Sequence, residues 1–568
     1  MLFEKYPTDR RVPIFAGDLM GSFSAIDQLT AALKYLDLVH DALQPKRSIS
    51  ELVFVFNEKT PAQVEQSIIE LLVSLAKLLQ TRALHVQIMR GLEHGGEDAD
   101  SLQSKYAALL EKTMTLSQTL KSEPRFHFAS SQVLGATLAL LPTPYYVRSA
   151  KTLLEKPEED LRLMVLQSLE TRSQDARPAD SAATVALLDI LPSLTAIVGD
   201  DVNVKLKHNA VACIDIIAEK FGKKGTSAVL SAAEVIASDS VFGSENNELR
   251  IISLLCLATT VEVLKDDLLP LLPMLFSRAF DYLDASSEPD SGSERLHDAV
   301  YAFIGSILEH LPWMFSEKSL EQTLRLSQKS AGSVVTGRKC ADSREQFCGL
   351  ASKQLDLKVL LSAMDSTFDH GVGFGYQSCR ETLRMLHKII TNQSKSTLVK
   401  NSSKLFPVLT RSFDLRRQLS TQSDTSYAEL ADLEQQRDNL TLDAIMRLND
   451  ATFRPFFMRL VQWATDGLSK QDAQGRVLRL SSLYEFLAKF FETLKVSHIF
   501  RDHNVHILTC TSSLSSLATL VTSWSKPQKH STMSSLMAMQ NVCSCRTCSK
   551  RCPPVSSTTR TVRICSSM

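Results

Sequence analysis

Residues 187–194 read Leu187-Leu188-Asp189-Ile190-Leu191-Pro192-Ser193-Leu194; Gly199-Asp200-Asp201 follow, and then an apolar stripe that ends before Gly222. The stripe consists of Val204, Ala210, Ile214, Ile217 and Ala218. Apolar residues that recur at steps of three and four are typical of one face of a helix. The first segment predicts a helix that Pro192 bends, and the glycine with two acids predicts a turn. The stretch therefore predicts two helices joined by a short connection.

The start of this second helix recurs along the chain. In each instance an apolar residue lies beside a basic one, close to acidic residues. The instances are Glu158-Glu159-Asp160-Leu161-Arg162, Asp200-Asp201 with Val204-Lys205, Glu248-Leu249-Arg250, and Glu294-Arg295-Leu296. Their apolar members lie 43, 45 and 47 residues apart, which matches the period of about 40–47 residues of HEAT and armadillo repeats. Acids complement the positive N-terminal end of a helix, and the basic residue can reach the acids of a neighbouring turn.

A single helix pair cannot bury its own apolar faces, so neighbouring pairs must share a core. The sequence therefore predicts an all-α fold, a HEAT/armadillo-like α-solenoid of stacked antiparallel helix pairs. Residues 268–273 and 405–409 are related pieces of the pattern. A generic helical bundle is the alternative, and the regular spacing argues against it. A series of alternating strands with tight hairpin turns is not found.

Two stretches away from these instances also show helical periodicity. Thr60-Pro61-Ala62-Gln63 predicts a helix start with a capping box. Its apolar face is predicted to contain Val64, Ile68, Leu72, Leu75 and Leu79. A second stripe contains Leu483, Phe486, Leu487, Phe490, Phe491 and Leu494. The polar segments 173–182, 285–294 and 421–425 predict surface loops.

The composition of the chain argues against a polyanion-binding protein of high positive charge and against a membrane protein. Lys plus Arg and Asp plus Glu each number 63 among 568 residues, so the chain has no global positive field to hold a polyanion. The N-terminus lacks the apolar core of a signal peptide, and no uninterrupted apolar run approaches the roughly 20 residues that a bilayer requires. We therefore expect a soluble intracellular protein without a membrane partner. Five scattered cysteines predict buried thiols in a reducing compartment; they are Cys213, Cys256, Cys340, Cys348 and Cys379.

The end of the chain changes character. Residues 503–568 contain no Asp or Glu, are rich in Ser and Thr, and lose helical periodicity. Translation in a wrong frame or through an intron would produce such a change, and a disordered basic tail is the other possibility. The tail holds Cys543, Cys545, Cys548 and Cys552. Four thiolates could hold tetrahedral zinc, but the spacing fits no standard zinc motif.

Other candidate sites also favour structural interpretations. Residues 369–376, Asp-His-Gly-Val-Gly-Phe-Gly-Tyr, fit no phosphate-binding fingerprint and predict a flexible helix connection. The histidines, among them His208, His297, His503 and His506, show no metalloprotease pattern and are interpreted as structural or exposed. Arg416, Arg417, Arg454 and Arg459 could touch RNA phosphate, but solvated helix faces explain them better. The sequence predicts no catalytic, cofactor-binding or metal-binding residues.

One stretch supports a resemblance to a known family. Leu448-Asn449-Asp450-Ala451-Thr452-Phe453-Arg454-Pro455-Phe456-Phe457 and Leu460-Val461-Gln462-Trp463-Ala464 precede Arg476 and a helix predicted over residues 480–494. This pattern resembles the C-terminal domain of the large HEAT-repeat proteins called U3 small nucleolar RNA-associated protein 10, or HEAT repeat-containing protein 1 in animals. The resemblance covers about residues 1–500, and it is specific in the Asn449–Trp463 stretch.

The resemblance implies a domain organisation and a function. It implies HEAT-like repeats over residues 1–400, a family-specific helical domain over 401–500, and an irregular tail over 501–568. It also implies a non-catalytic scaffold of the nucleolar small-subunit processome, acting in ribosomal DNA transcription and early pre-18S rRNA processing. Its partners would be other processome proteins and the pre-rRNA/U3 ribonucleoprotein. Because family members are longer, the chain is interpreted as a C-terminal fragment or a truncated gene model. A HEAT-repeat transport adaptor of the importin type is the alternative.

Overall fold

The computed structural model of the chain describes residues 23–43, 61–286, 293–333, 340–420, 425–465 and 472–499, the last six of these by their backbone only. The chain divides into two units, Met1–Phe491 and Glu492–Met568. Only the end of the last helix belongs to the described part of the second unit. All regular elements that the described residues form are helices.

The first unit begins with a group of long helices. They are α3 (Ala25–Ala42), α5 (Pro61–Leu79), α6 (Arg82–His94), α7 (Glu97–Thr119) and α8 (Pro124–Leu140). Helix α7 packs against α3, α6 and α8, and α5 packs against α8. The predicted face of α5 is buried at Ile68, Leu72, Leu75 and Leu79. Helix α5 begins at Pro61 as predicted, whereas Thr60 and the side chain of Val64 lie outside the description.

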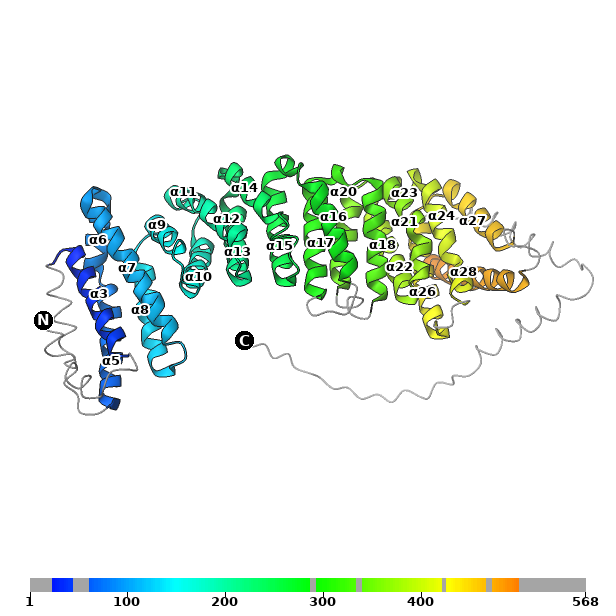
Figure 1. Cartoon of the computed structure of the whole chain (residues 1–568). Coiled ribbons are helices and arrows are strands. Elements are labelled where there is room, and N and C mark those ends of the chain that lie inside the picture. The colour runs from blue at the N-terminus through cyan, green and yellow to red at the C-terminus, as the bar shows by residue number, and fades with distance from the viewer. Residues whose placement is uncertain are drawn as a thin grey trace, which may run out of the picture. The chain divides into compact units, whose positions relative to one another are not determined.

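The remaining helices succeed one another along the array in chain order and belong to two rows (Figure 1). The first row contains α9 (Thr143–Leu154), α11 (Ser181–Asp189), α12 (Leu191–Asp200), α14 (Thr226–Ile236), α16 (Leu272–Ala285), α18 (Glu317–Gly332), α21 (Leu357–Gly373), α24 (Ser402–Phe413) and α27 (Asp450–Thr465). The second row contains α10 (Glu159–Asp175), α13 (Val204–Phe221), α15 (Asn247–Leu264), α17 (Ser293–His310), α20 (Ala341–Gln354), α22 (Tyr376–Asn392), α26 (Tyr427–Ile445) and α28 (Ala473–Ile499). Successive helices belong alternately to the two rows, except that α11 and α12 both belong to the first row. Short helices join them: η1 (Gly222–Lys224), η2 (Lys265–Leu268), η3 (Pro312–Met314), α23 (Lys395–Lys400) and α25 (Leu415–Leu419).

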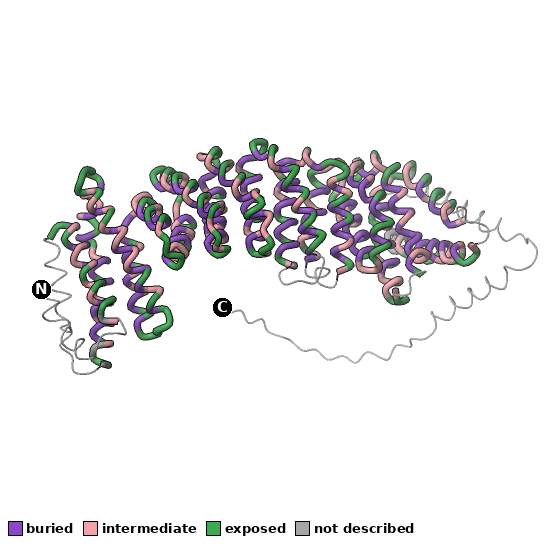
Figure 2. The backbone as a smooth tube through the Cα atoms, in the orientation of Figure 1, coloured by how far each residue is buried: buried purple, intermediate pink, exposed green. Residues whose placement is uncertain are grey.

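Most helices pack on a helix of the other row and on the next helix of their own row. In the second row, α10, α13, α15, α17, α20, α22 and α26 contact one another successively. Contacts such as α12 with α13, α16 with α17 and α21 with α22 join the rows. Buried residues therefore occur on every helix of the array (Figure 2). The HEAT/armadillo-like solenoid predicted from the repeat spacing is confirmed, and the bundle alternative is not needed.

The unit at 187–222 forms as predicted, with shifts of a few residues. Asn203 caps α13, because its Oδ1 accepts hydrogen bonds from the backbone N–H groups of Lys205 and Leu206. Ala210, Ile214, Ile217 and Ala218 are fully buried. Val204, however, is 36% exposed, whereas Leu206 is fully buried. Leu206 is therefore the residue that begins the buried stripe of this repeat, and the prediction of Val204 was wrong.

Segment Ser181–Asp200 is apolar and long enough to cross a membrane, with a mean hydropathy of 1.8. The expectation from sequence differs because it rests on uninterrupted apolar runs, and polar residues interrupt this segment. In the structure the segment divides at Ile190 into α11 and α12, and Pro192 lies in the first turn of α12 rather than bending one helix. Its apolar residues pack on α9, α13 and α14. The hydropathy of this segment is thus explained by the shared core of neighbouring repeats.

The predicted loops are shorter than expected or lie outside the description. The chain is helical up to Asp175 and again from Ser181, so only residues 176–180 connect α10 to α11. Residues 287–292 and 421–424 are not described. The glycine-rich segment at 369–376 is mostly the last turn of α21. Only Phe374 and Gly375 link α21 to α22, and the φ of Gly375 is 87°, a left-handed conformation that favours glycine.

Candidate functional site

Polar contacts connect the first turns of the second-row helices. The Arg162 guanidinium at the start of α10 lies 2.7 Å from Oδ2 of Asp201, just before α13. One turn away, Nδ2 of Asn203 donates a hydrogen bond of 2.6 Å to Glu159. The same arrangement joins α15 to α17, where Arg295 and Glu248 are 2.7 Å apart. The prediction that the repeated basic residues reach acids of a neighbouring turn is confirmed for these two arginines.

A groove of about 590 Å³ opens over these first turns. Its lining residues are Gln118, Lys121, Asp160, Leu163, Met164, Gln167, Val204, Lys205, His208, Asn209, Asn246 and Glu248. They come from α7, α10, α13 and the start of α15, so the groove crosses successive repeats. Two lysines and two carboxylates face it, which gives a surface of mixed charge. We name it the first groove.

A second groove of about 690 Å³ crosses the other row. Its lining residues are Glu317, Glu321, Leu361, Ser362, Asp365, Ser366, Asp369, Ser403, Lys404, Pro407, Arg411 and Arg459. Arg411 pairs with Asp365 at 3.1 Å and with Asp369 at 3.2 Å. Lys404 and Arg459 are exposed. This second groove therefore has an acidic end on α18 and α21 and a basic end on α24 and α27.

A buried ionic cluster fills the interior between α24 and α28. Its members are Asp414, Arg416, Arg417, Glu434, Arg437, Asp438 and Arg479. Nε of Arg479 donates to Asp414 over 2.7 Å, and Nη2 of Arg437 donates to Asp438 over 2.6 Å. The guanidinium of Arg437 lies 4.5 Å from the ring centre of Phe413. We name this set the Asp414 cluster.

The carboxylate of Asp414 is held in its charged form. Burial by itself would raise the pKa of Asp414, but the hydrogen bonds from Arg417 and Arg479 outweigh it and lower that pKa below its ordinary value. Arg416 also belongs to the cluster, because it pairs with Glu434, and it lies 2.6 Å from Glu485. The sequence analysis placed Arg416 and Arg417 on solvated helix faces or on RNA phosphate. They instead neutralise acids within the fold.

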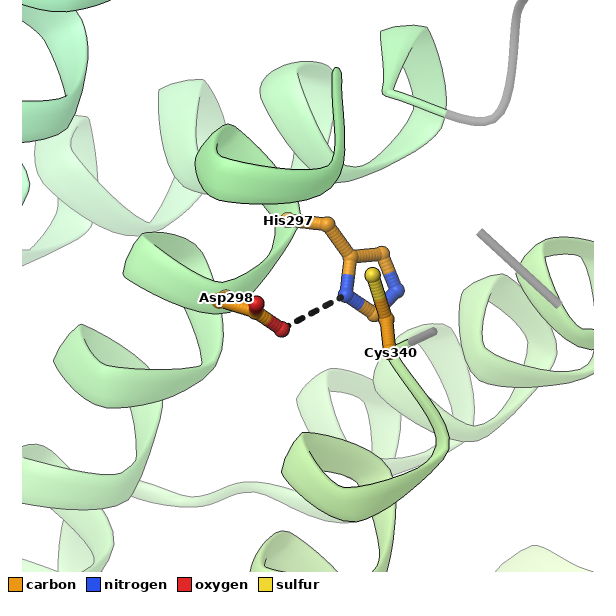
Figure 3. Close-up of side chains that lie close together, drawn as sticks. All are labelled: His297, Asp298 and Cys340. Carbon is orange, nitrogen blue, oxygen red and sulfur yellow. Dashed lines mark ion pairs between the residues drawn. The ribbon is translucent and has the colours of Figure 1, made fainter. Parts of the chain in front are cut away.

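A smaller cluster joins α17 to α20. His297 and Asp298 lie in the first turns of α17, and Cys340 is the N-cap residue of α20 (Figure 3). Their ligand atoms all lie within 4.8 Å of one another. His297 and Cys340 are buried, whereas about half of the Asp298 side chain is exposed. The interpretation of His297 as structural or exposed gave no reason to pair it with Cys340, because no spacing motif connects the two residues.

Other predicted candidates have more ordinary surroundings or lie outside the described residues. The five scattered cysteines are free and buried, as predicted. Arg454 and Arg459 are exposed on α27, and His208 lines the first groove. Cys543, Cys545, Cys548, Cys552, His503 and His506 are not described.

Comparison with known proteins finds a matching domain model and similar chains. The model of the BP28CT (NUC211) domain matches residues 397–536. The chain is 34% identical over 498 residues, 87% of its length, to U3 small nucleolar RNA-associated protein 10 of Pyricularia oryzae. It is 35% identical over 500 residues to the protein of the same name from Aspergillus fumigatus. This chain is a relative of U3 small nucleolar RNA-associated protein 10. It spans 28% of the length of these relatives.

Solved structures give a more distant comparison. Importin beta superposes with a TM-score of 0.35 at 12% identity, over 77% of this chain and 57% of that one. The Kap95:Nup1 complex gives 0.34 at 11% identity, over 85% and 61%. Similarity of this size has no bearing on function. The domain model, by contrast, reaches 36 residues beyond residue 500, so the boundary at 500 stays a prediction.

Proposed function

We propose that this chain acts as a non-catalytic scaffold in ribosome biogenesis, within the nucleolar small-subunit processome. The observation that supports this most directly is the identity of 34–35% to U3 small nucleolar RNA-associated protein 10 over 87% of the chain. On this proposal the chain resides in the nucleolus. Its partners are other processome proteins and the pre-rRNA/U3 ribonucleoprotein, and its role is in ribosomal DNA transcription and early pre-18S rRNA processing.

The grooves suggest how such a scaffold would bind. Each crosses several repeats, so a partner that lies in it would contact many helices through modest interactions. Both contain acids as well as basic residues. A polyanion binds clustered Lys and Arg tightly because binding releases its counterions to the solvent. In these grooves the basic residues lie among acids and do not form such clusters. The mixed charge fits polypeptide partners better than bare RNA.

We propose the three regions that the sequence predicts. Residues 1–400 would provide the repeats, residues 401–500 a family-specific helical domain, and residues 501–568 an irregular tail. The Asp414 cluster lies wholly within 401–500 and joins α25, α26 and α28. This cluster would give residues 401–500 a fixed internal arrangement.

The tagged full chain tests the proposal in cells. We expect nucleolar concentration and co-purification of U3 small nucleolar RNA with processome proteins. The double variant Lys404→Glu/Arg459→Glu, which reverses the basic end of the second groove, should lower the recovered processome proteins severalfold. A matched reversal at Arg125→Glu, an exposed residue on α8, should leave recovery unchanged. Accumulation at nuclear pores with transport cargo, and no U3 RNA, would instead support the importin-type adaptor.

A further inference from the structure

Three electron-pair donors converge at the junction of α17 and α20. The imidazole Nδ1 of His297 is buried and has no hydrogen-bond partner among the described residues. Oδ1 of Asp298 lies 3.9 Å from it, too far for a hydrogen bond. The sulfur of Cys340 completes the group, and all three ligand atoms lie within 4.8 Å of one another (Figure 3). Asp298 Oδ1 also accepts a hydrogen bond from Oγ of Ser343, and the Cys340 thiol lies 3.7 Å from the carbonyl oxygen of Glu294. Among the three donors, Nδ1 of His297 is the one left without a partner in the described part of the chain.

The other side of the imidazole is held in place. Nε2 of His297 and Oγ of Ser330 are 2.7 Å apart. Nη1 of Arg344 donates to the same Oγ over 3.1 Å, and a metal at Nδ1 requires the tautomer in which Nε2–H also donates to this oxygen. In that tautomer the free lone pair is on Nδ1 and is directed toward Asp298. A metal-binding histidine is commonly oriented in this way through its second nitrogen.

We propose that His297, Asp298 and Cys340 form a binding site for Zn²⁺, which joins α17 to α20. Imidazole, thiolate and carboxylate are all ligands that zinc accepts. In a tetrahedral site with bonds of about 2.0–2.3 Å, the ligand atoms are roughly 3.3–3.8 Å apart, so small side-chain rotations would close the site. Three protein ligands leave a fourth position, on the solvent side of Asp298, for water or for a partner's side chain.

The charges balance at such a site. Binding requires the Cys340 thiol to release its proton to solvent, so that Zn²⁺ meets one thiolate and one carboxylate and the net charge is zero. The nearby Arg344 is itself compensated by Glu381, 3.3 Å away. Because protons compete with Zn²⁺ for the Cys340 sulfur, affinity should fall as pH is lowered. The site is independent of the proposed scaffold role.

Metal content tests the proposal in the full chain. The tail cysteines could also bind zinc, so the measurement is made in a background in which all six are replaced by serine: Cys510, Cys543, Cys545, Cys548, Cys552 and Cys565. We expect one equivalent of Zn²⁺ by elemental analysis after dialysis. Substitution with Co²⁺ should give a sulfur-to-metal charge-transfer band that disappears in Cys340→Ser. Cys348→Ser, which changes another buried cysteine of α20, is the matched control and should keep both signals.

A second pair of variants separates a metal site from a structural contact. Asp298 is half exposed, so Asp298→Asn should fold normally yet bind Zn²⁺ at least tenfold more weakly in a competition assay with a chromophoric chelator. Ser330→Ala, which removes the partner of Nε2, should weaken binding about 10–100-fold. Absence of bound zinc in the folded tail-substituted chain, or a Co²⁺ spectrum that survives Cys340→Ser, would overturn the proposal. The three residues would then be only a polar contact between α17 and α20.

Discussion

At the scale of single residues, the interior of residues 401–500 contains buried charges that are each paired with an opposite charge. Arg437 is fully buried and Asp438 nearly so, and each is stabilised only because an opposite charge touches it. A buried ion pair contributes little net stability compared with apolar residues of the same size, but removing one partner leaves the other charge unpaired. The Asp414 cluster is therefore sensitive to single substitutions.

Arg437→Ala should lower the free energy of unfolding of this region by about 3–5 kcal/mol. The loss follows because Glu434 and Asp438 would stay buried without the guanidinium. Urea unfolding followed by the fluorescence of Trp463, in a Trp313→Phe/Trp524→Phe background, reports on this region. Arg295→Ala removes an exposed ion pair and should change its local stability by at most about 1 kcal/mol. Equal losses in both variants would contradict the argument.

Acid should weaken the same region through Asp414. The folded-state pKa of Asp414 lies below its ordinary value of 3.8, since Arg417 and Arg479 hold it ionised. Its stabilising contribution is thus complete above the unfolded pKa and is lost as pH falls through the folded pKa. Stability measured through Trp463 should decline below about pH 4, and Asp414→Asn should show a shallower decline. Parallel pH profiles would mean that Asp414 contributes nothing to the acid response.

At the scale of elements, several helices of the array, among them α11, α13, α15, α18, α21 and α26, begin at a capping side chain and continue as a buried stripe. In α13, Asn203 provides the cap and Leu206 the first buried side chain. Helix periodicity and the repeat spacing suffice to predict such a pair from sequence. They do not fix the first residue of the stripe, because apolar residues flank every helix start and only packing decides which of them is covered.

Leu206→Ala should destabilise the repeat by about 2–5 kcal/mol, because it leaves a cavity between α13 and its neighbours. Val204→Ala, two residues away and partly exposed, should cost less than about 1 kcal/mol. Asn203→Ala should cost about 1 kcal/mol through the lost cap. Native-state hydrogen exchange of the α13 amides measures all three. A larger effect at Val204 than at Leu206 would restore the register expected from sequence alone.

The clusters lay beyond sequence reasoning for a different reason. Asp414 and Arg479 are 65 residues apart in the chain, and no motif relates their positions. His297 and Cys340 likewise meet only because α17 and α20 are neighbours in one row. The sequence predicts the row but not the angle at which the helices cross. The stacking of the helices can therefore be predicted from the sequence. The side-chain contacts between successive helices cannot, and they are seen only in the structure.

At the scale of the described array, stability should be local. Successive helices contact mainly their neighbours, so the effect of a mutation is expected to decay along the rows. Leu206→Ala should speed hydrogen exchange in α10, α13 and α15 and leave α24 unchanged. Uniform acceleration throughout the array would show instead that the repeats unfold as one cooperative unit.

The polar contacts between Arg162 and Asp201 and between Arg295 and Glu248 have an electrostatic consequence along one edge. Each second-row helix presents its unpaired amide groups and partial positive charge at its first turn, and these turns lie beside one another. Left bare, such an edge would attract phosphate. Glu159, Asp160, Asp201 and Glu248 occupy it instead. These acids offset the partial positive charge of the helix starts, while Arg162 and Arg295 pair with two of them, so the edge carries mixed charge and not a row of bare anion-binding sites.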